Sequence, residues 1–289
     1  MSAVVKQSAG AIESRLPRAA YDAIDAINIS RLKNLRRSGL HYQYALTHPY
    51  ESAALTLGVA THVAVLEPER FETEFAIWAN RTEAGKMSPR SGKVWDAFKA
   101  SHAARTILTA DEAADAQAIA AAVRGDATAM KYLESGDPEV SMQWDIEGRA
   151  CKGRIDWLTT IEGVPYIVGL KTTRDCRHFA FGAQAAKLEY GMQWAYYHDG
   201  FWAITGKQPR MIEIVVESDA PYAVATYRIE DDILLQGRDN YLQLLKTLAE
   251  CEAAGEWPGP ELGEQILTLP SWYYPTDDDM SDLGLQAIA

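Results

Sequence analysis

Residues 140–173 read VSMQWDIEGRACKGRIDWLTTIEGVPYIVGLKTT, and this stretch decides the fold. From Val140 to Ile146 apolar residues alternate with polar ones, which is typical of a strand with one buried face. Glu147-Gly148 and Glu162-Gly163 are turn signals, and they divide the stretch into three strands. The sequence therefore predicts two successive hairpins at this point of the chain.

Helical patterns surround these strands on both sides. The chain before them is mostly helical, and two helices, two strands and a long final helix follow them. This order predicts an α/β (α+β) domain with a mixed central sheet flanked by helices. We expect an N-terminal arm over residues 1–20, a single domain over 21–254 and an acidic C-terminal tail over 255–289. Within the domain, the helical part covers about 21–136 and the sheet core about 138–254.

Composition narrows the class of protein. The 289 residues are 47% hydrophobic and 24% charged, which is ordinary for a globular chain. No apolar run is long enough for a membrane span, and the N-terminus lacks the apolar segment of a secretory signal. Cys151, Cys176 and Cys251 are too few and too scattered for a disulfide framework or a four-cysteine cluster. We expect a cytoplasmic protein without a membrane partner.

The net charge of −12 argues at first against a nucleic-acid partner. However, residues 230–289 hold 13 acidic and two basic residues, so this last part of the chain carries −11. The remainder is close to neutral, and the local field depends on where its charges lie. The overall charge therefore does not exclude a DNA-binding groove.

Two charged side chains of the predicted hairpins suggest a site that could bind a metal and activate water. Asp156 lies on one face of the second strand, and Lys171 shares a face of the third with Gly169. If these strands pair, the carboxylate and the ammonium converge. A carboxylate is a hard ligand for Mg²⁺, and a lysine can orient water and stabilise charge on a phosphate. On these two residues alone, a surface ion pair is the more ordinary explanation.

Several motifs in order resemble those of the PD-(D/E)XK nuclease superfamily, in its RecB-like branch. They are Gly153-Arg-Ile-Asp156, Gly169-Leu-Lys171-Thr-Thr173 and Gln193-x-x-x-Tyr197. Upstream, Leu57–Pro68 with its central His62 resembles the first motif of that branch. The chain over roughly residues 20–250 is similar to the RecE (exonuclease VIII) nuclease domain in particular.

The resemblance implies a restriction-endonuclease-like core and hydrolysis of phosphodiester bonds with Mg²⁺, or with Mn²⁺. RecE-like enzymes degrade one strand of linear double-stranded DNA from its 5′ end, in phage-type recombination. They form ring-shaped tetramers and work beside a single-strand annealing protein of the RecT type. The resemblance thus implies an exodeoxyribonuclease that acts on DNA ends, forms a homo-oligomer and works in a bacterial or phage-infected cell.

The resemblance also implies roles for individual residues. His62, Asp156 and the main-chain carbonyl of Leu170 would hold the metal. Lys171 would position the attacking water. The pair in the Gln193-x-x-x-Tyr197 motif lies on one helix face and would support the site and the DNA strand.

Gly169 departs from the family pattern, which places an acid two residues before the lysine. One expected metal ligand is therefore missing at this position. Three explanations remain open: an inactivating change, a natural protein with degenerate activity, or substitution by another acid. The candidates for that substitution are Asp175, Glu162 and Glu139. We expect a catalytically impaired protein, and we expect Gly169→Asp to raise its activity.

Contacts to DNA are predicted for side chains near the motifs and for a basic stretch between helices, although a solvated surface explains the same residues. The candidates are Lys152, Arg154, Thr172, Thr173, Lys86, Arg90 and Lys93. Such contacts would make affinity fall with salt. The alternative function is a nuclease fold without catalysis that binds DNA ends or a partner protein.

Overall fold

A six-stranded mixed sheet forms the centre of the protein, in the strand order β1-β4-β5-β6-β7-β8. The computed structural model describes residues 6–7, 9–48, 53–82, 85, 87–260 and 263–269. Only β6 and β7 pair in parallel, and every other neighbouring pair of this sheet is antiparallel. The strands are β1 (Ala11–Glu13), β4 (Asp137–Ile146), β5 (Arg149–Ile161), β6 (Val164–Thr173), β7 (Arg210–Glu217) and β8 (Val224–Arg228). The two hairpins that the sequence predicts are confirmed as β4–β5–β6.

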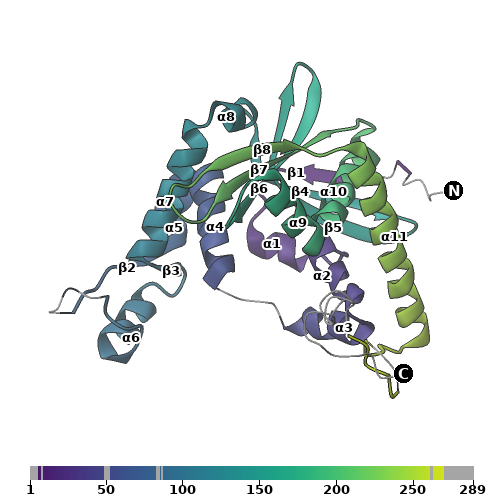
Figure 1. Cartoon of the computed structure of the whole chain (residues 1–289), viewed down its shortest axis with the longest axis horizontal. Coiled ribbons are helices and arrows are strands. Elements are labelled where there is room, and N and C mark those ends of the chain that lie inside the picture. Colours follow the sequence, from purple (N-terminus) through teal and green to yellow (C-terminus); the bar gives the residue numbers. More distant parts are fainter. Residues whose placement is uncertain are drawn as a thin grey trace, which may run out of the picture.

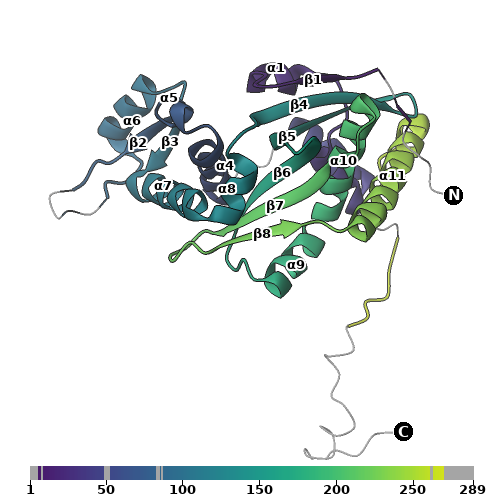
Figure 2. The same cartoon turned by 90° about the horizontal axis from the view of Figure 1, so that it is seen from above.

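Helices cover both faces of this sheet (Figures 1 and 2). One apolar core joins the sheet to α2, α9, α10 and α11, and a second core joins it to α4, α5, α7 and α8. The helices are α1 (Arg18–Ala23), α2 (Ile29–Leu32), α3 (Gly39–Thr47), α4 (Ala53–Leu66), α5 (Phe71–Glu74), α6 (Gly92–Ser101), α7 (Ala110–Gly125), α8 (Ala127–Leu133), α9 (His178–Lys187), α10 (Tyr190–Thr205) and α11 (Asp231–Ala254), with 3₁₀ turns η1 (Lys33–Arg36) and η2 (Pro68–Arg70). The predicted fold class, a mixed α/β domain, is confirmed.

A second, two-stranded sheet lies apart from the main one beside α6 (Figure 1). Its strands β2 (Phe75–Trp78) and β3 (Thr106–Thr109) pair in parallel. The sequence does not predict this unit, because each strand has only four residues and too short an alternation to stand out.

Local signals at helix starts are partly confirmed. Thr109 and Glu112 form the capping box that their spacing predicts at the start of α7. Asn28 caps α2, because its side chain accepts from the Arg31 N–H. Asparagine and serine cap helices about equally well, and they stand here at positions 28 and 30, so the sequence alone does not fix the start of α2.

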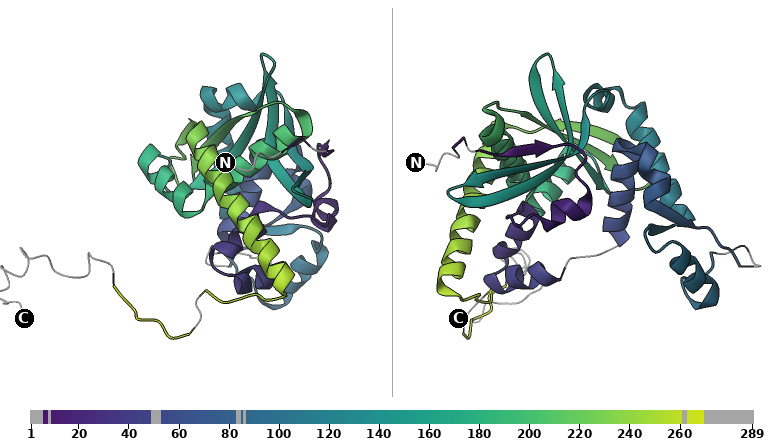
Figure 3. Two further views of the ribbon diagram at one scale, coloured as in Figure 1. Left: turned by 90° about the vertical axis from the view of Figure 1, so that its right-hand side faces the viewer. Right: turned by 180° about the vertical axis from the view of Figure 1, so that it is seen from behind.

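The contact between α10 and α11 depends on Gly237, and α11 runs along one side of the molecule (Figure 3). A Cβ added at Gly237 would overlap the backbone carbonyl of Gly191. We therefore expect Gly237→Ala to lower the free energy of unfolding by about 1–3 kcal/mol or more, as overpacking does. Gly182→Ala on α9 meets no atom within 4 Å and is the matched control. It should stabilise by up to about 1 kcal/mol, because alanine favours helix. Urea unfolding of both variants checks this, and equal midpoints would contradict it.

No helix in the described part of the chain is long and apolar enough to cross a membrane. Cys151, Cys176 and Cys251 are all buried free thiols.

Candidate active site

The site begins where β5 and β6 separate. Their ladder runs from Ile161–Val164 to Trp157–Val168. Beyond it, the N–H of Leu170 donates to Asp156 Oδ2 at 2.9 Å, and the carbonyl of Leu170 accepts from His62 Nε2 at 2.8 Å. Side chains therefore satisfy the N–H and the C=O of Leu170 in place of a neighbouring strand, and they bring a carboxylate and an imidazole together.

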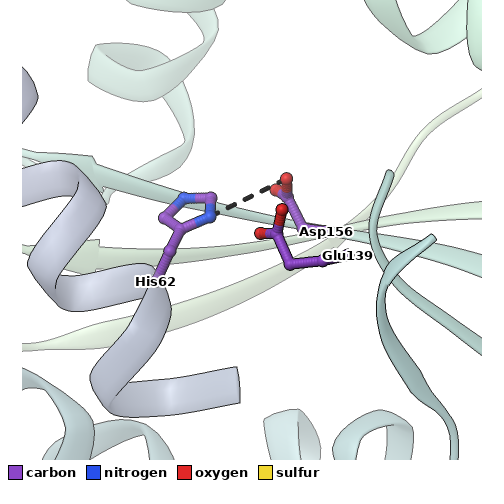
Figure 4. Close-up of side chains that lie close together, drawn as sticks. All are labelled: His62, Glu139 and Asp156. Atoms are coloured by element: carbon purple, nitrogen blue, oxygen red, sulfur yellow. Dashed lines mark ion pairs between the residues drawn. The ribbon is translucent and has the colours of Figure 1, made fainter. Parts of the chain in front are cut away.

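Three candidate metal ligands converge at this opening (Figure 4). His62 comes from α4, Glu139 from β4 and Asp156 from β5, and one ligand atom from each lies within 4.8 Å of the others. His62 Nε2 carries the proton that it donates to the Leu170 carbonyl, so Nδ1 is the ring nitrogen that could bind a metal. That Nδ1 lies 3.7 Å from Asp156 Oδ1. An imidazole nitrogen and two carboxylates fit a divalent cation such as Mg²⁺ or Mn²⁺.

Electrostatics around Glu139 agree with a cation at this point. Burial raises the pKa of Glu139, and the nearby Asp156 carboxylate raises it further. Arg154 forms an ion pair with Glu139 at 2.6 Å and holds it in place. Two carboxylates that repel each other in a partly buried site are stabilised when a divalent ion binds between them.

Lys171 lies on the other side of Asp156, between two acids. Its Nζ is 3.6 Å from Asp156 Oδ2 and 3.4 Å from Glu213 Oε1. Burial alone would lower the pKa of Lys171, but Glu213 and Asp156 outweigh it and raise the pKa above its usual value. Burial likewise acts to raise the pKa of Asp156, yet Lys171, His62 and the Leu170 N–H together lower it. Lys171 is therefore an ammonium and Asp156 a carboxylate at neutral pH.

A small cavity lies beside this lysine. It has a volume of about 10 Å³, enough for roughly one water molecule. Polar groups of its lining belong to Asp156, Lys171, Gln193, Tyr197 and Glu213. A single water held there would lie among groups that can orient it.

Gln193 and Tyr197 reach the cavity from α10, as their four-residue spacing predicts. Gln193 Nε2 donates to the Tyr197 hydroxyl at 3.4 Å. Burial, and then the charge of Asp156, raises the pKa of Tyr197 to about 12, so its hydroxyl stays protonated. A Cβ at Gly153 would lie 2.9 Å from the Tyr197 ring, so the glycine of the Gly153-Arg-Ile-Asp156 motif makes room for it.

Glu213 is a site residue that the sequence motifs do not predict. It lies on β7 directly beside Gly169 of β6 and is only 1% exposed. Trp194 Nε1 donates to its Oε2 at 2.5 Å. One signal for it was available, because a lone acid within the apolar run Met211–Val216 must have a partner if it is buried.

Of the three acids considered as substitutes for the missing motif acid, one lies at the site. Glu139 belongs to the cluster with His62 and Asp156. Asp175 pairs with Arg177 at 2.6 Å and is not among the residues that line the cavity. Glu162 lies in the exposed turn between β5 and β6, six residues or roughly 20 Å along the strand from Asp156.

Two of the predicted DNA contacts of β5 are used inside the protein. Lys152 is 1% exposed, and its ammonium donates to the carbonyls of Tyr21, Asp22 and Ile24. The prediction that Lys152 contacts phosphate is wrong, since no strand of DNA can reach it. Arg154 is largely buried and forms an ion pair with Glu139, so its charge acts on the cluster of His62, Glu139 and Asp156.

The predicted contacts that follow Lys171 differ in exposure. Thr172, the residue after Lys171, is half-buried. Thr173 is buried, and its hydroxyl donates to Gln184 at 2.9 Å, which leaves it unavailable to DNA in this structure.

The predicted contacts in the basic stretch lie at the second sheet. Lys93 is exposed at the start of α6. Arg90 pairs with Glu112 at 3.0 Å and lies over the Trp95 ring. Lys86 lies outside the described residues. With Lys99, His102 and Arg105, Arg90 lines a hollow of about 670 Å³ beside α6.

A further lysine near the site was not among the predicted contacts. Lys33 and Lys171 lie 5.6 and 5.7 Å from the centre of the Tyr190 ring. Burial, and then the like charge of Lys171, lowers the pKa of Lys33 to about 8. Lys33 therefore adds positive charge near the cavity at neutral pH.

Fold and site together define a nuclease-like class of protein, and comparison with known families agrees. Residues 28–266 match the family described as "PDDEXK-like domain of unknown function (DUF3799)". The chain belongs to this family.

Solved structures agree with this fold. The chain is similar to the crystal structure of a "Putative exonuclease" from Eubacterium rectale, with a TM-score of 0.60 and 16% identity over 89% of this chain and 96% of that one. Similarity to SSO0001 (TM-score 0.28, 15% identity, 74% and 85% coverage) and to VC1899 from Vibrio cholerae (0.24, 12%, 83% and 58%) is too weak to support an argument. No curated protein matches the chain. The structural comparison shows the fold alone.

Proposed function

We propose that the protein is a metal-dependent deoxyribonuclease that hydrolyses phosphodiester bonds of linear double-stranded DNA. The observation that carries the proposal is the convergence of His62, Asp156 and Lys171 at the opening between β5 and β6. An imidazole, a carboxylate and a lysine from three separate elements are more than a surface ion pair requires. Membership of a PDDEXK-like family supports the same chemistry.

Each residue of the site has its own role in the proposed hydrolysis. His62, Glu139 and Asp156 would hold Mg²⁺, which supplies a lower pKa for bound water and neutralises charge on the phosphate. Lys171 orients the attacking water and stabilises the charge that develops as water adds to phosphorus. The water oxygen bonds to phosphorus and releases one proton to solvent. The bond from phosphorus to the leaving oxygen breaks, and that oxygen takes one proton from solvent, which leaves a terminal phosphate and a free hydroxyl. Gln193 and Tyr197 position these groups from α10.

Polarity and partners are proposed from the resemblance to RecE-like enzymes. We propose 5′→3′ degradation from DNA ends, a ring-shaped homo-oligomer and cooperation with a RecT-like annealing protein in recombination. The basic hollow beside α6 would contact the DNA backbone away from the cleaved bond.

The test uses linear duplex DNA labelled at its 5′ or 3′ end, with circular duplex DNA of the same sequence as a control. We expect cleavage with Mg²⁺ or Mn²⁺, none with EDTA, early release of the 5′ label and an intact circle. Binding without cleavage under all these conditions would favour the alternative function, a catalytically inactive module that holds DNA ends. Early release of the 3′ label would contradict only the proposed polarity.

A further inference from the structure

We propose that Glu213 replaces the missing acid of the Gly169-x-Lys171 motif, so that the motif's carboxylate is supplied from the neighbouring strand. This inference rests on the proposed nuclease function and names an additional residue for metal binding. It also replaces the expectation that Gly169 impairs catalysis with the expectation that the protein is active.

The first argument is steric. A Cβ built on Gly169 would lie 2.5 Å from both carboxylate oxygens of Glu213. The carboxylate of Glu213 thus occupies the volume into which a side chain at position 169 would project. Gly169 and Glu213 are direct partners in the parallel ladder between β6 and β7, where strands lie about 4.8 Å apart. A glutamate is long enough to cross that gap, and glycine is the residue that leaves room for it.

The second argument concerns charge and hydrogen bonding. Glu213 Oε1 is buried and accepts no hydrogen bond, although Lys171 Nζ lies 3.4 Å away. A buried carboxylate oxygen without a hydrogen bond is costly, and a bound cation would satisfy it. Glu213 lines the same small cavity as Asp156 and Lys171. Two acids and a lysine therefore share one water-sized space, which is the set that the motif normally supplies from a single hairpin.

Glu139 is the competing candidate, and the structure gives it a different place. It lies on the His62 side of Asp156, and Arg154 neutralises its charge at 2.6 Å. It does not line the cavity beside Lys171. Glu139 therefore adds a ligand on that side, whereas Glu213 occupies the position of the motif acid.

The experiment moves the acid from one strand to the other in the 289-residue chain. The variants are Glu213→Gln, Gly169→Asp, and the double exchange Gly169→Asp with Glu213→Ala. Glu217→Gln, the same change four residues along β7, is the matched control. Each is assayed for cleavage of linear duplex DNA with Mg²⁺, for Mn²⁺ affinity by calorimetry without DNA, and for its unfolding midpoint.

We expect Glu213→Gln to lower cleavage about 100-fold and Mn²⁺ affinity about 10- to 100-fold, while the control changes neither. Gly169→Asp alone should lower the unfolding midpoint without raising activity, since two carboxylates would crowd one volume. The double exchange should bring cleavage and Mn²⁺ affinity back to within about tenfold of the original protein.

Several outcomes would overturn the inference and leave the nuclease function standing. These are full cleavage and full Mn²⁺ affinity in Glu213→Gln, or a folded double exchange that recovers neither property. If no version cleaves DNA but Mn²⁺ affinity follows the pattern expected for Glu213, the nuclease proposal fails and the carboxylate replacement is supported.

Discussion

Asp156→Asn should abolish DNA hydrolysis, with a loss of about 10³-fold, because Asp156 joins both halves of the site. One of its oxygens faces His62 Nδ1 and the other faces Lys171 and the Leu170 N–H. Asparagine keeps an oxygen that can accept from Leu170, but it loses the charge that holds a divalent ion. Rates of cleavage of linear duplex DNA with Mg²⁺ measure the effect, and Mn²⁺ affinity should fall in parallel.

Glu162→Gln is the matched control for this variant. It makes the same kind of change in the same hairpin, at an exposed turn away from the site. Unchanged cleavage in the control, together with an Asp156→Asn protein that is still folded at the temperature of the assay, assigns the loss to chemistry. Cleavage by Asp156→Asn at the original rate would refute the proposed site.

Lys171→Met should remove cleavage and also destabilise the fold at neutral pH. It leaves Asp156 and the fully buried Glu213 facing each other without the ammonium between them. Loss of one member of a buried ion pair costs about 3–5 kcal/mol. Lys187→Met on α9 removes an exposed lysine and is the control, which should unfold like the original protein.

The deficit of Lys171→Met should depend on pH in a defined direction. Burial already raises the pKa of Glu213 above its ordinary value of 4.5, and losing Lys171 raises it further. A carboxyl with a raised folded-state pKa contributes stability below its unfolded pKa, and this contribution is lost as pH rises through the folded-state value. The deficit should therefore shrink as pH is lowered from about 8 towards about 5. Urea unfolding across this range measures it, and a deficit that grows on acidification would contradict it.

Much of the fold follows from local pattern. The alternation and turns of residues 140–173 predict β4, β5 and β6, because each strand is long and each turn has a glycine. The capping box at Thr109 places the start of α7 for the same local reason. The short strands β2 and β3 were missed, since four residues give too little periodicity.

The site was predictable only in part. His62, Asp156 and Lys171 follow from motif order, and the structure brings them together. The burial of Lys152 was not predictable, because the carbonyls that bind its ammonium come from a segment about 130 residues away. Glu213 was missed for a similar reason: its neighbour in space, Gly169, is 44 residues away in the chain, and only the pairing of β6 with β7 reveals the contact.

The side-by-side register of Gly169 and Glu213 has a consequence for how relatives of this protein are recognised. In a parallel ladder, adjacent residues project to the same face, so an acid can move from one strand to the next while the backbone stays unchanged. A lineage that first gained a glutamate at position 213 would then tolerate loss of the acid at position 169. Searches that demand both motif acids within a single hairpin would discard such descendants as inactive. A search that also compares residues paired across adjacent strands would retain them.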